Sequence, residues 1–327
     1  MKMDNEQLFL QQVLQHYGLA AASVYPLRSY NNFVYRVENA DHQCFSLRIC
    51  GFPKMKRRSM EDEMVWLNFL AQRNPRLAPH PIANDQDEWV TVIPTPEGER
   101  LCALFAWVEG SKLRDAVTPG DLHKMGRLVA ALHNLAREFP FPDAASDFRS
   151  GYRYDQSLMH DHRDWIEQHR STIGPVHVML LERAIAYVLA AMDRMATTPA
   201  NYGMIHADLT FGNLLVHEEE IYLIDFEQLG RGHYLYDFAV LWGELHAAAG
   251  DFAPRWQSFV AGYGEVAALP FHYAAELNPF IIATQLNHLD WVYNTDNPVV
   301  RAEFGPQLPL IYASIQQRLG ESRPDEL

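Results

Sequence analysis

The chain has 327 residues, 48% of them hydrophobic, so it is long enough to bury a core in one large domain or in two lobes. Its 27 basic and 41 acidic residues give a formal net charge of −14 with no long basic face, which argues against nucleic acid or an anionic membrane as partner and suits a cationic substrate. The three cysteines form no C-x-x-C pair, and no stretch resembles a signal peptide or approaches the ~18 apolar residues of a membrane span, so a cytoplasmic setting is expected.

The first hundred residues show a helix pattern followed by strand patterns. Apolar residues at helical spacing predict a helix over residues 4–18. The strand-like segments that follow are Ser23–Leu27, Phe33–Glu38 and Cys44–Ile49. A second helix is predicted to begin at Ser59, which has an acid three residues later as in a capping box. Two further strand-like runs, 89–93 and 101–108, predict another hairpin.

Helical patterns dominate from residue 118 onward. Thr118-Pro-Gly-Asp is a strong helix start, with Thr as the N-cap and Pro at the first helical position. A Pro-rich break at 140–142 precedes a polar and aromatic insertion over 143–178, for which the sequence indicates no role. A helical run over 180–195 then leads into a segment with a different character.

That segment, residues 204–227, predicts a loop, a β-hairpin and a second loop. Apolar 214–216 and 222–224 are the expected strands, and the polar run 217–220 is the expected turn. The motif His206-x-Asp208-x4-Asn213 stands before the hairpin, and Asp225-Phe-Glu stands after it.

Pairing the two strands brings Asn213 and Asp225 side by side, with Asp208 one loop turn away. An amide oxygen and a carboxylate suit a hard cation that keeps some of its waters, as Mg²⁺ does. The third group, the Asp208 carboxylate, is left to receive a proton. Phosphoryl transfer from a metal–nucleotide needs such a trio, because the metal neutralises the phosphates while a carboxylate orients the attacking hydroxyl. The alternative is an ordinary surface hairpin with solvated acids at its ends.

These residues resemble a known family. Ile-His-Ala-Asp-Leu-Thr-Phe-Gly-Asn-Leu-Leu, then Leu-Ile-Asp-Phe-Glu, then Tyr236-Asp237-Phe-Ala, are similar to the motifs of the aminoglycoside phosphotransferase family. That family is a branch of the protein-kinase-like fold, which also holds choline, homoserine and methylthioribose kinases. The resemblance implies a two-lobed α+β fold: a nucleotide-binding lobe with a small antiparallel sheet over 1–107, and a mainly helical catalytic and substrate-binding lobe over 108–327.

The resemblance also assigns roles in the catalytic lobe. Asp208 would be the catalytic base in a loop that opens with His206, and Asn213 and Asp225 would bind the metal. Asp237, at the start of the next helix, would brace that loop. Protein kinases usually have Arg between the His and the Asp of this motif, where it pairs with a phosphate of the activation loop. Here Ala stands at that place and pairs with nothing, so control by such phosphorylation is not expected.

In the amino-terminal lobe, the resemblance places Arg48 where the phosphate-binding lysine falls. A permanent charge and a rigid fork of donors allow Arg to hold phosphates or to pair with a carboxylate; the plainer reading is a cross-strand surface arginine. Glu63 is the expected carboxylate partner, with Glu61 as the alternative. The turn that replaces the glycine-rich loop has no glycine, and a plain hairpin turn is the alternative for it. The implied ATP-binding residues are Arg48, Glu63, Ser29, Asn31, Asn32, Ala106, Trp107 and Val108.

The insertion contains a second triplet of the kinase type. His162-Arg163-Asp164 has the letters of the protein-kinase catalytic loop, but His169 stands where the Asn should follow. Because no hairpin and no Asp-Phe come after it, we reject this triplet as the catalytic loop.

Residues for the acceptor substrate are harder to identify. An acid beside aromatic rings suits an amine or a quaternary ammonium, through charge and cation–π attraction. Glu244 with Trp242, and Asp290 with Trp291, are the candidates, although the plainer reading makes both tryptophans ordinary core residues.

We therefore expect an ATP- and Mg²⁺-dependent phosphotransferase acting on a small-molecule hydroxyl, of the aminoglycoside, amino alcohol, hydroxy amino acid or amino sugar type. One alternative is a protein Ser/Thr kinase of the stress-response type on the same fold, which the turn Ser29-Tyr-Asn-Asn-Phe-Val-Tyr resembles. The other is a nucleotide-binding scaffold without catalysis. The sequence selects neither the acceptor nor the oligomeric state.

Overall fold

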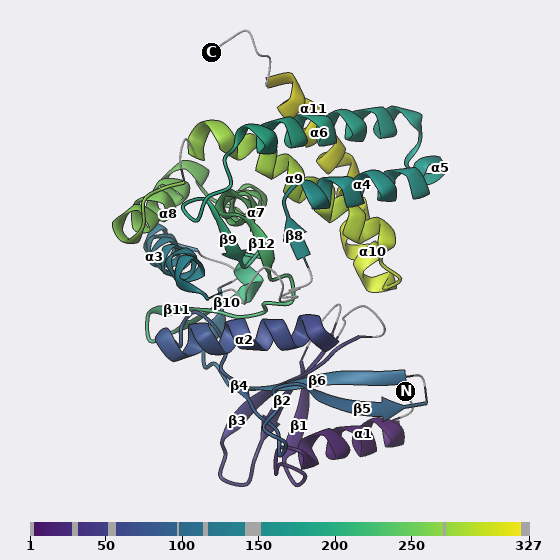
Figure 1. Ribbon diagram of the computed structural model, residues 1–327, viewed down its shortest axis with the longest axis vertical. Helices are drawn as coiled ribbons and strands as arrows, with labels where there is room; N and C mark the ends of the chain where they lie inside the picture. Colours follow the sequence, from purple (N-terminus) through teal and green to yellow (C-terminus); the bar gives the residue numbers. More distant parts are fainter. Residues whose placement is uncertain are drawn as a thin grey trace. The chain divides into compact units, whose positions relative to one another are not determined.

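The protein is described by a computed structural model that covers residues 3–27, 32–51, 57–96, 98–113, 117–140, 152–270 and 273–321. The chain forms two compact units (Figure 1), and each is assembled from separate stretches of sequence. Unit 1 consists of Met1–Leu113, Phe139–Gly151 and Gly212–Phe226; unit 2 consists of Arg114–Glu138, Tyr152–Phe211 and Glu227–Leu327. The expected two-lobed α+β class is confirmed. The contiguous division at residue 107 stays a prediction.

Unit 1 is built on an antiparallel sheet with the strand order β1-β2-β3-β6-β4, and β5 also pairs with β6. The first three strands lie where the sequence predicts them. The helices and strands of unit 1 are α1 (Met3–Gln15), β1 (Ser23–Leu27), β2 (Phe33–Glu38), β3 (Cys44–Ile49), α2 (Arg57–Arg73), β4 (Pro81–Ile82), β5 (Thr91–Thr95), β6 (Gly98–Ala106), β7 (Ser111–Lys112), β10 (Leu214–His217) and β11 (Glu220–Leu223). Helix α2 begins two residues before the predicted start, because Arg57 and Arg58 already belong to it.

The strand register separates the two faces of this sheet. Residues paired across antiparallel strands point to the same face, so Val34, Arg48 and Ala103 share one face. Their strand neighbours point the other way, and Leu47 is fully buried there against the apolar side of α1. Helix α1 thus covers one face of the sheet, and the face that carries Arg48 is the one that meets α2 (Figure 1).

Unit 2 is mainly helical and contains a small three-stranded sheet in the order β8-β12-β9. Its helices and strands are α3 (Pro119–Glu138), β8 (Tyr152–Tyr154), α4 (Gln156–Gln168), α5 (Arg170–Ile173), α6 (Pro175–Arg194), β9 (Tyr202–Ile205), β12 (Gly230–His233), α7 (Tyr234–Ala247), α8 (Phe252–Val266), α9 (Tyr273–Asn294), α10 (Pro298–Phe304) and α11 (Leu308–Glu321). The start of α3 is capped as predicted, because Thr118 Oγ1 accepts the N–H of Asp121 while Asp121 accepts the N–H of Thr118.

Helices α3 and α8 pack main chain against main chain. A β-carbon at Gly126 would overlap the carbonyl of Phe259, and one at Gly262 would overlap the carbonyl of His123. Only glycine permits this approach. It brings His133 on α3 and Tyr263 on α8 within hydrogen-bonding distance.

The rejected triplet His162-Arg163-Asp164 lies inside α4, a regular helix. A catalytic loop needs a main chain that leaves helical geometry to present its acid, so the helix agrees with the rejection of this triplet.

Among the described residues, α6 is the one helix with the length and apolar composition of a membrane span. It packs against α4, α9 and α11, and Leu181, Ile185 and Val188 are fully buried in unit 2. The core helix of a folded protein passes the same test of length and composition, so this helix is weak evidence for a membrane.

Candidate active site

The predicted hairpin is present in unit 1 as β10 and β11, with Leu214 opposite Leu223 and His217 opposite Glu220. The turn is tighter than the sequence prediction. It consists only of Glu218 and Glu219, both with positive φ (49° and 65°), as in the two-residue turns that match the twist of a hairpin. His217 and Glu220, expected in the turn, are therefore strand residues.

The open end of this hairpin brings Asn213 and the segment before Asp225 together. The N–H of Ile224 donates to the carbonyl of Asn213 at 3.0 Å. Asn213 is buried, whereas Asp225 is exposed and has a φ of 65°, a left-handed conformation that a non-glycine residue keeps only at some cost. The arrangement offers one amide oxygen and one carboxylate at the same end of the hairpin.

These oxygen donors fit Mg²⁺ better than a metal that needs a complete protein cage. Within the described part of the chain, no group of three or more His, Cys, Asp or Glu residues could hold a metal ion. Mg²⁺ characteristically keeps several waters and takes only one or two protein ligands together with substrate phosphates. The assignment of Asn213 and Asp225 as metal ligands stays a prediction that the donor chemistry supports.

Also in unit 1, Arg48 on β3 and Glu63 on α2 form a buried bidentate pair. Nη1 donates to Oε1 at 2.8 Å and Nη2 donates to Oε2 at 2.7 Å. Burial raises the pKa of Glu63 and the contact with Arg48 opposes that shift, while the negative charge of Asp225 adds to it. Asp225 is therefore close enough to this pair to be felt electrostatically. Glu61, the alternative partner, instead pairs with Arg57 on the surface of α2.

The remaining residues expected to bind ATP are partly described. Ser29 and Asn31 lie outside the described residues. Asn32 Oδ1 accepts the N–H of Gly51 at 3.2 Å. At the end of β6, the N–H of Ala106 donates to the carbonyl of His80, so this N–H belongs to the sheet. Trp107 and Val108 follow Ala106 and are half-buried. Their contacts with a nucleotide stay predictions.

In unit 2, strand β9 leads directly into the loop that carries Asp208. Ala207 has a φ of 62°, so the main chain turns sharply between His206 and Asp208. The N–H of Asp208 donates to His206 Nδ1 at 3.3 Å, and the N–H of Thr210 donates to the carbonyl of Asp208 at 2.8 Å. Asp208 is half-buried, so part of the residue is accessible to solvent.

Asp237, in the first turn of α7, is fully buried beneath this loop. Its Oδ1 accepts the N–H of Ala207 at 2.7 Å, and its Oδ2 accepts the N–H of His206 at 3.1 Å. The structure thus brings Asp237 into contact with the loop that the resemblance expects it to brace. The two bonds hold the main chain immediately before Asp208.

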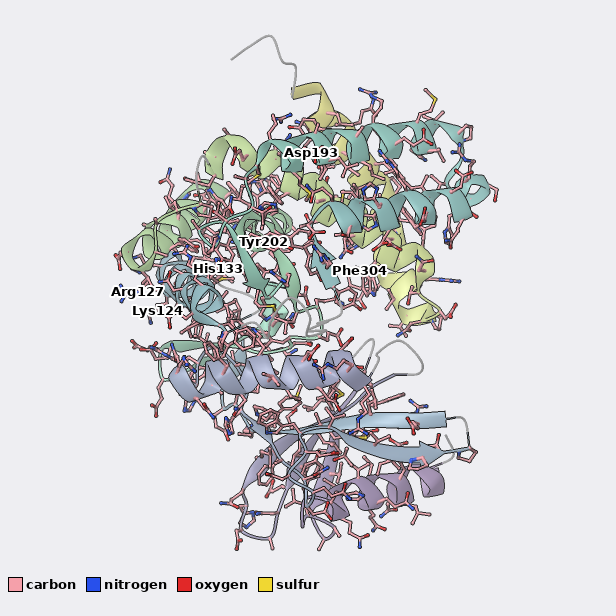
Figure 2. The ribbon with its side chains drawn as sticks, in the orientation of Figure 1. Lys124, Arg127, His133, Asp193, Tyr202 and Phe304 are labelled. Atoms are coloured by element: carbon pink, nitrogen blue, oxygen red, sulfur yellow. The ribbon has the colours of Figure 1, made fainter. Side chains whose placement is uncertain are left out.

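Two residues that the sequence did not single out for this role extend the same network. His133 on α3 (labelled in Figure 2) places Nε2 3.0 Å from Asp237 Oδ2 and Nδ1 2.9 Å from the hydroxyl of Tyr263 on α8. Burial lowers the pKa of His133, so the ring is neutral, with its one proton on the nitrogen that faces the carboxylate. Tyr263 then donates to Nδ1. No signal in the sequence links these residues, because they come from three different helices.

Two buried tyrosines lie near enough to Asp208 and Asp237 to be affected by their charges. The rings of Tyr154 and Tyr236 are 4.4 Å apart, and the hydroxyl of Tyr154 donates to the carbonyl of Gln228 at 2.7 Å. Burial raises the pKa of both tyrosines, and the negative charges of Asp208 and Asp237 contribute to the shift. Both hydroxyls therefore stay protonated.

The four candidates for acceptor contacts lie on two helices, α7 and α9. Trp242 stacks on His246, with ring centroids 3.4 Å apart, and the guanidinium of Arg318 lies over its ring. Glu244 Oε2 accepts the N–H of Phe211 at 3.0 Å, and burial raises its pKa.

The other two candidates lie on α9. Asp290 accepts hydrogen bonds from His162 Nδ1 and from the side chain of Asn294. Trp291 packs edge-to-face against His288 and Phe304. Residues one or two apart on a helix point in different directions, so neither pair forms a single acid–aromatic pocket. A role in acceptor binding stays a prediction for all four.

His233, directly before α7, makes the stability of unit 2 sensitive to acid. It is buried between Tyr202 and Phe280, and burial lowers its pKa from 6.5 to about 4. Since the unfolded chain binds the proton first, the contribution of His233 to stability is fully present above pH 6.5. It is lost as the pH falls toward 4, by about 3 kcal/mol in total.

We expect His233→Gln to flatten the fall in unfolding free energy between pH 7.5 and 4.5, as measured by chemical denaturation. His160→Gln, which alters an exposed histidine on α4, should keep the wild-type slope. Equal slopes for wild type and His233→Gln would show that His233 is not held neutral.

Comparison with known proteins identifies a family and several similar proteins. The model of the phosphotransferase enzyme family matches residues 24–277. The chain is 24% identical over 243 residues to amicoumacin kinase from Bacillus subtilis, covering 73% of this chain and 68% of the relative. The structure of a microcompartment-associated aminopropanol kinase matches with a TM-score of 0.77 and 24% identity over 95% of both chains. A structure of amicoumacin kinase in complex with AMP-PNP, Ca²⁺ and Ami matches with a TM-score of 0.75 and 18% identity, covering 97% and 96% of the two chains.

Proposed function

The chain belongs to the phosphotransferase enzyme family, and from this premise we propose that it transfers the γ-phosphoryl group of ATP to a hydroxyl of a small molecule with the help of Mg²⁺. Membership of that family makes the protein an enzyme of the kinase type. The observation that carries the proposal is that only five residues of chain separate Asp208, in its bound loop, from Asn213 at the open end of the hairpin. Asp208 follows a loop bound to Asp237, and five residues later Asn213 is bound to the segment that ends in Asp225.

The residues of unit 1 would hold the nucleotide and its metal. Oxygen atoms of Asn213 and Asp225 suit Mg²⁺, and the amicoumacin kinase complex with AMP-PNP and Ca²⁺ supports the use of a nucleotide and a divalent ion. The permanent charge of a guanidinium suits phosphates, and two hydrogen bonds to Glu63 hold that of Arg48 in place. We assign Arg48 to the phosphates and Glu63 to its orientation.

The residues of unit 2 would act on the acceptor. Bound Mg²⁺ and ATP supply the phosphoryl group and the positive charge that offsets its developing negative charge. The Asp208 carboxylate accepts a hydrogen bond from the acceptor hydroxyl and takes its proton as the new O–P bond forms and the bond to the ADP oxygen breaks. Asp237, through the N–H groups of His206 and Ala207, keeps the loop in the conformation that presents Asp208.

For the acceptor we propose a hydroxyl compound that also carries an amine. Aminopropanol and amicoumacin kinases are among the similar proteins, and the net charge of −14 favours a cationic substrate. Of the two acidic candidates, Glu244 binds the main chain of the Asp208 loop, whereas Asp290 bonds to His162. Asp290 shares helix α9 with Trp291 and is the acid that we favour for contact with the amine. We propose the cytoplasm as the place of action, with neither nucleic acid nor membrane as partner.

The test is consumption of ATP with a panel of amino alcohols, hydroxy amino acids, amino sugars and aminoglycosides, run with and without Mg²⁺. We expect turnover with at least one amine-bearing hydroxyl compound and none after chelation of the metal. Phosphate incorporation into protein instead of a small molecule would favour the stress-response kinase alternative. Nucleotide binding without turnover for any acceptor would favour the non-catalytic scaffold.

A further inference from the structure

Helix α7 presents two carboxylates, Asp237 and Glu244, on one face. They are seven residues apart, which is close to two full turns, so they lie about 10 Å apart along the helix axis. Asp237 is fully buried, and Glu244 is half-buried. Helix α7 packs against β9, the strand from which the Asp208 loop leaves (Figure 1).

Both carboxylates bind main-chain N–H groups of that one loop, on opposite sides of Asp208. Asp237 accepts the N–H groups of His206 and Ala207, which lie two residues and one residue before Asp208. Glu244 Oε2 accepts the N–H of Phe211, three residues after it, at 3.0 Å. Between these points the N–H of Asp208 bonds to His206 Nδ1.

The Phe211 N–H needs such an acceptor. Phe211 begins the 3-10 helix Phe211–Asn213, and the first N–H groups of any helix have no acceptor within it. The Phe211 residue is itself buried, so an N–H left without a partner there would be costly. A carboxylate is a favourable acceptor at the start of a helical turn.

We propose that Glu244 is a positioning residue for phosphoryl transfer, because it fixes the loop after Asp208 as Asp237 fixes it before. Asp208 is then held from both sides and keeps its carboxylate directed at the acceptor hydroxyl. The inference rests on the proposed function for the role of Asp208. This role stands in place of the acceptor contact that the sequence suggested for Glu244, because Oε2 of this residue faces a main-chain N–H.

Three substitutions of Glu244 separate the effect of side-chain length from the effect of charge. Glu244→Gln keeps the length and an oxygen acceptor but removes the charge. Glu244→Asp keeps the charge but shortens the side chain by ~1.5 Å, and Glu244→Ala removes both. Glu182→Ala, which removes an exposed carboxylate from α6, is the matched control.

We expect kcat for the acceptor found in the panel to fall about 10- to 100-fold in Glu244→Ala and Glu244→Asp, because small misplacements of a reacting group are costly. The acceptor KM should change less than about threefold in both. Glu244→Gln should keep kcat within about threefold of wild type, since its amide oxygen still accepts the N–H. Glu182→Ala should equal wild type in both parameters.

Hydrogen–deuterium exchange provides a readout that does not depend on activity. The N–H of Phe211 should exchange faster in Glu244→Ala and Glu244→Asp and at the wild-type rate in Glu244→Gln. The N–H groups of His206 and Ala207 should stay protected in all three. A raised acceptor KM with unchanged kcat in Glu244→Gln and Glu244→Ala alike, or unchanged Phe211 exchange in Glu244→Ala, would overturn the inference. Absence of any turnover in the wild type would defeat the proposed function, while the exchange result would still decide whether Glu244 braces the loop.

Discussion

Replacing Asp208 by Asn is expected to abolish nearly all phosphoryl transfer while leaving the fold intact. The amide has the size of the carboxylate but cannot take the proton of the acceptor hydroxyl, and a positioned proton acceptor contributes about 10²- to 10⁴-fold to a rate. We expect kcat to fall within that range. The KM for ATP should change little, because the proposed nucleotide contacts belong to unit 1.

The chain supplies its own control for this experiment. Asp164 ends the rejected triplet His162-Arg163-Asp164 and is exposed on α4. Asp164→Asn should leave kcat unchanged, and both variants should show the circular dichroism spectrum of the wild type. If Asp164→Asn lost activity and Asp208→Asn kept it, the catalytic loop would have been assigned to the wrong segment.

The second large effect is expected from Asp237→Ala. The substitution leaves three donors without their acceptor, namely the N–H groups of His206 and Ala207 and Nε2–H of His133. Each buried donor without a partner costs about 1–3 kcal/mol, so a loss of roughly 4 kcal/mol or more in unfolding free energy is expected. Activity should be lost as well, because the loop before Asp208 is no longer fixed.

Chemical denaturation measures the loss of stability, and a graded series guards against a variant that does not fold. Tyr263→Phe removes only the outermost hydroxyl of the network and should cost about 1 kcal/mol with activity retained. Asp237→Asn keeps one oxygen acceptor and should fall between the two. If Asp237→Ala unfolded at the wild-type denaturant concentration and turned over normally, the buried network would carry no part of the structure of the site.

The sequence by itself determined the local elements of the site. The alternation of polar and apolar residues gave β2, β3 and the hairpin of β10 and β11, because side chains of a strand alternate between two faces. The hairpin then placed Asn213 and Asp225 at its open end without further information. The turn was predicted two residues too long, since polarity does not reveal that two residues of positive φ suffice to reverse the chain.

Only the tertiary structure decided which partner each side chain has. The sequence left both Glu63 and Glu61 as partners of Arg48, because the choice depends on how α2 is rotated against the sheet. It also offered Glu244 as an acceptor contact, a role that stays a prediction, and it could not show that the packing of α7 brings Oε2 of this residue to the N–H of Phe211.

The network of His133, Asp237 and Tyr263 was hidden for the same reason. Asp237 and Tyr263 lie 104 and 130 residues after His133 in the chain, and His133 meets Tyr263 where α3 and α8 approach through Gly126 and Gly262. Periodicity and motif spacing describe neighbours along the chain. Contacts between helices depend on how closely and at what rotation those helices pack, and that is decided when the whole core closes.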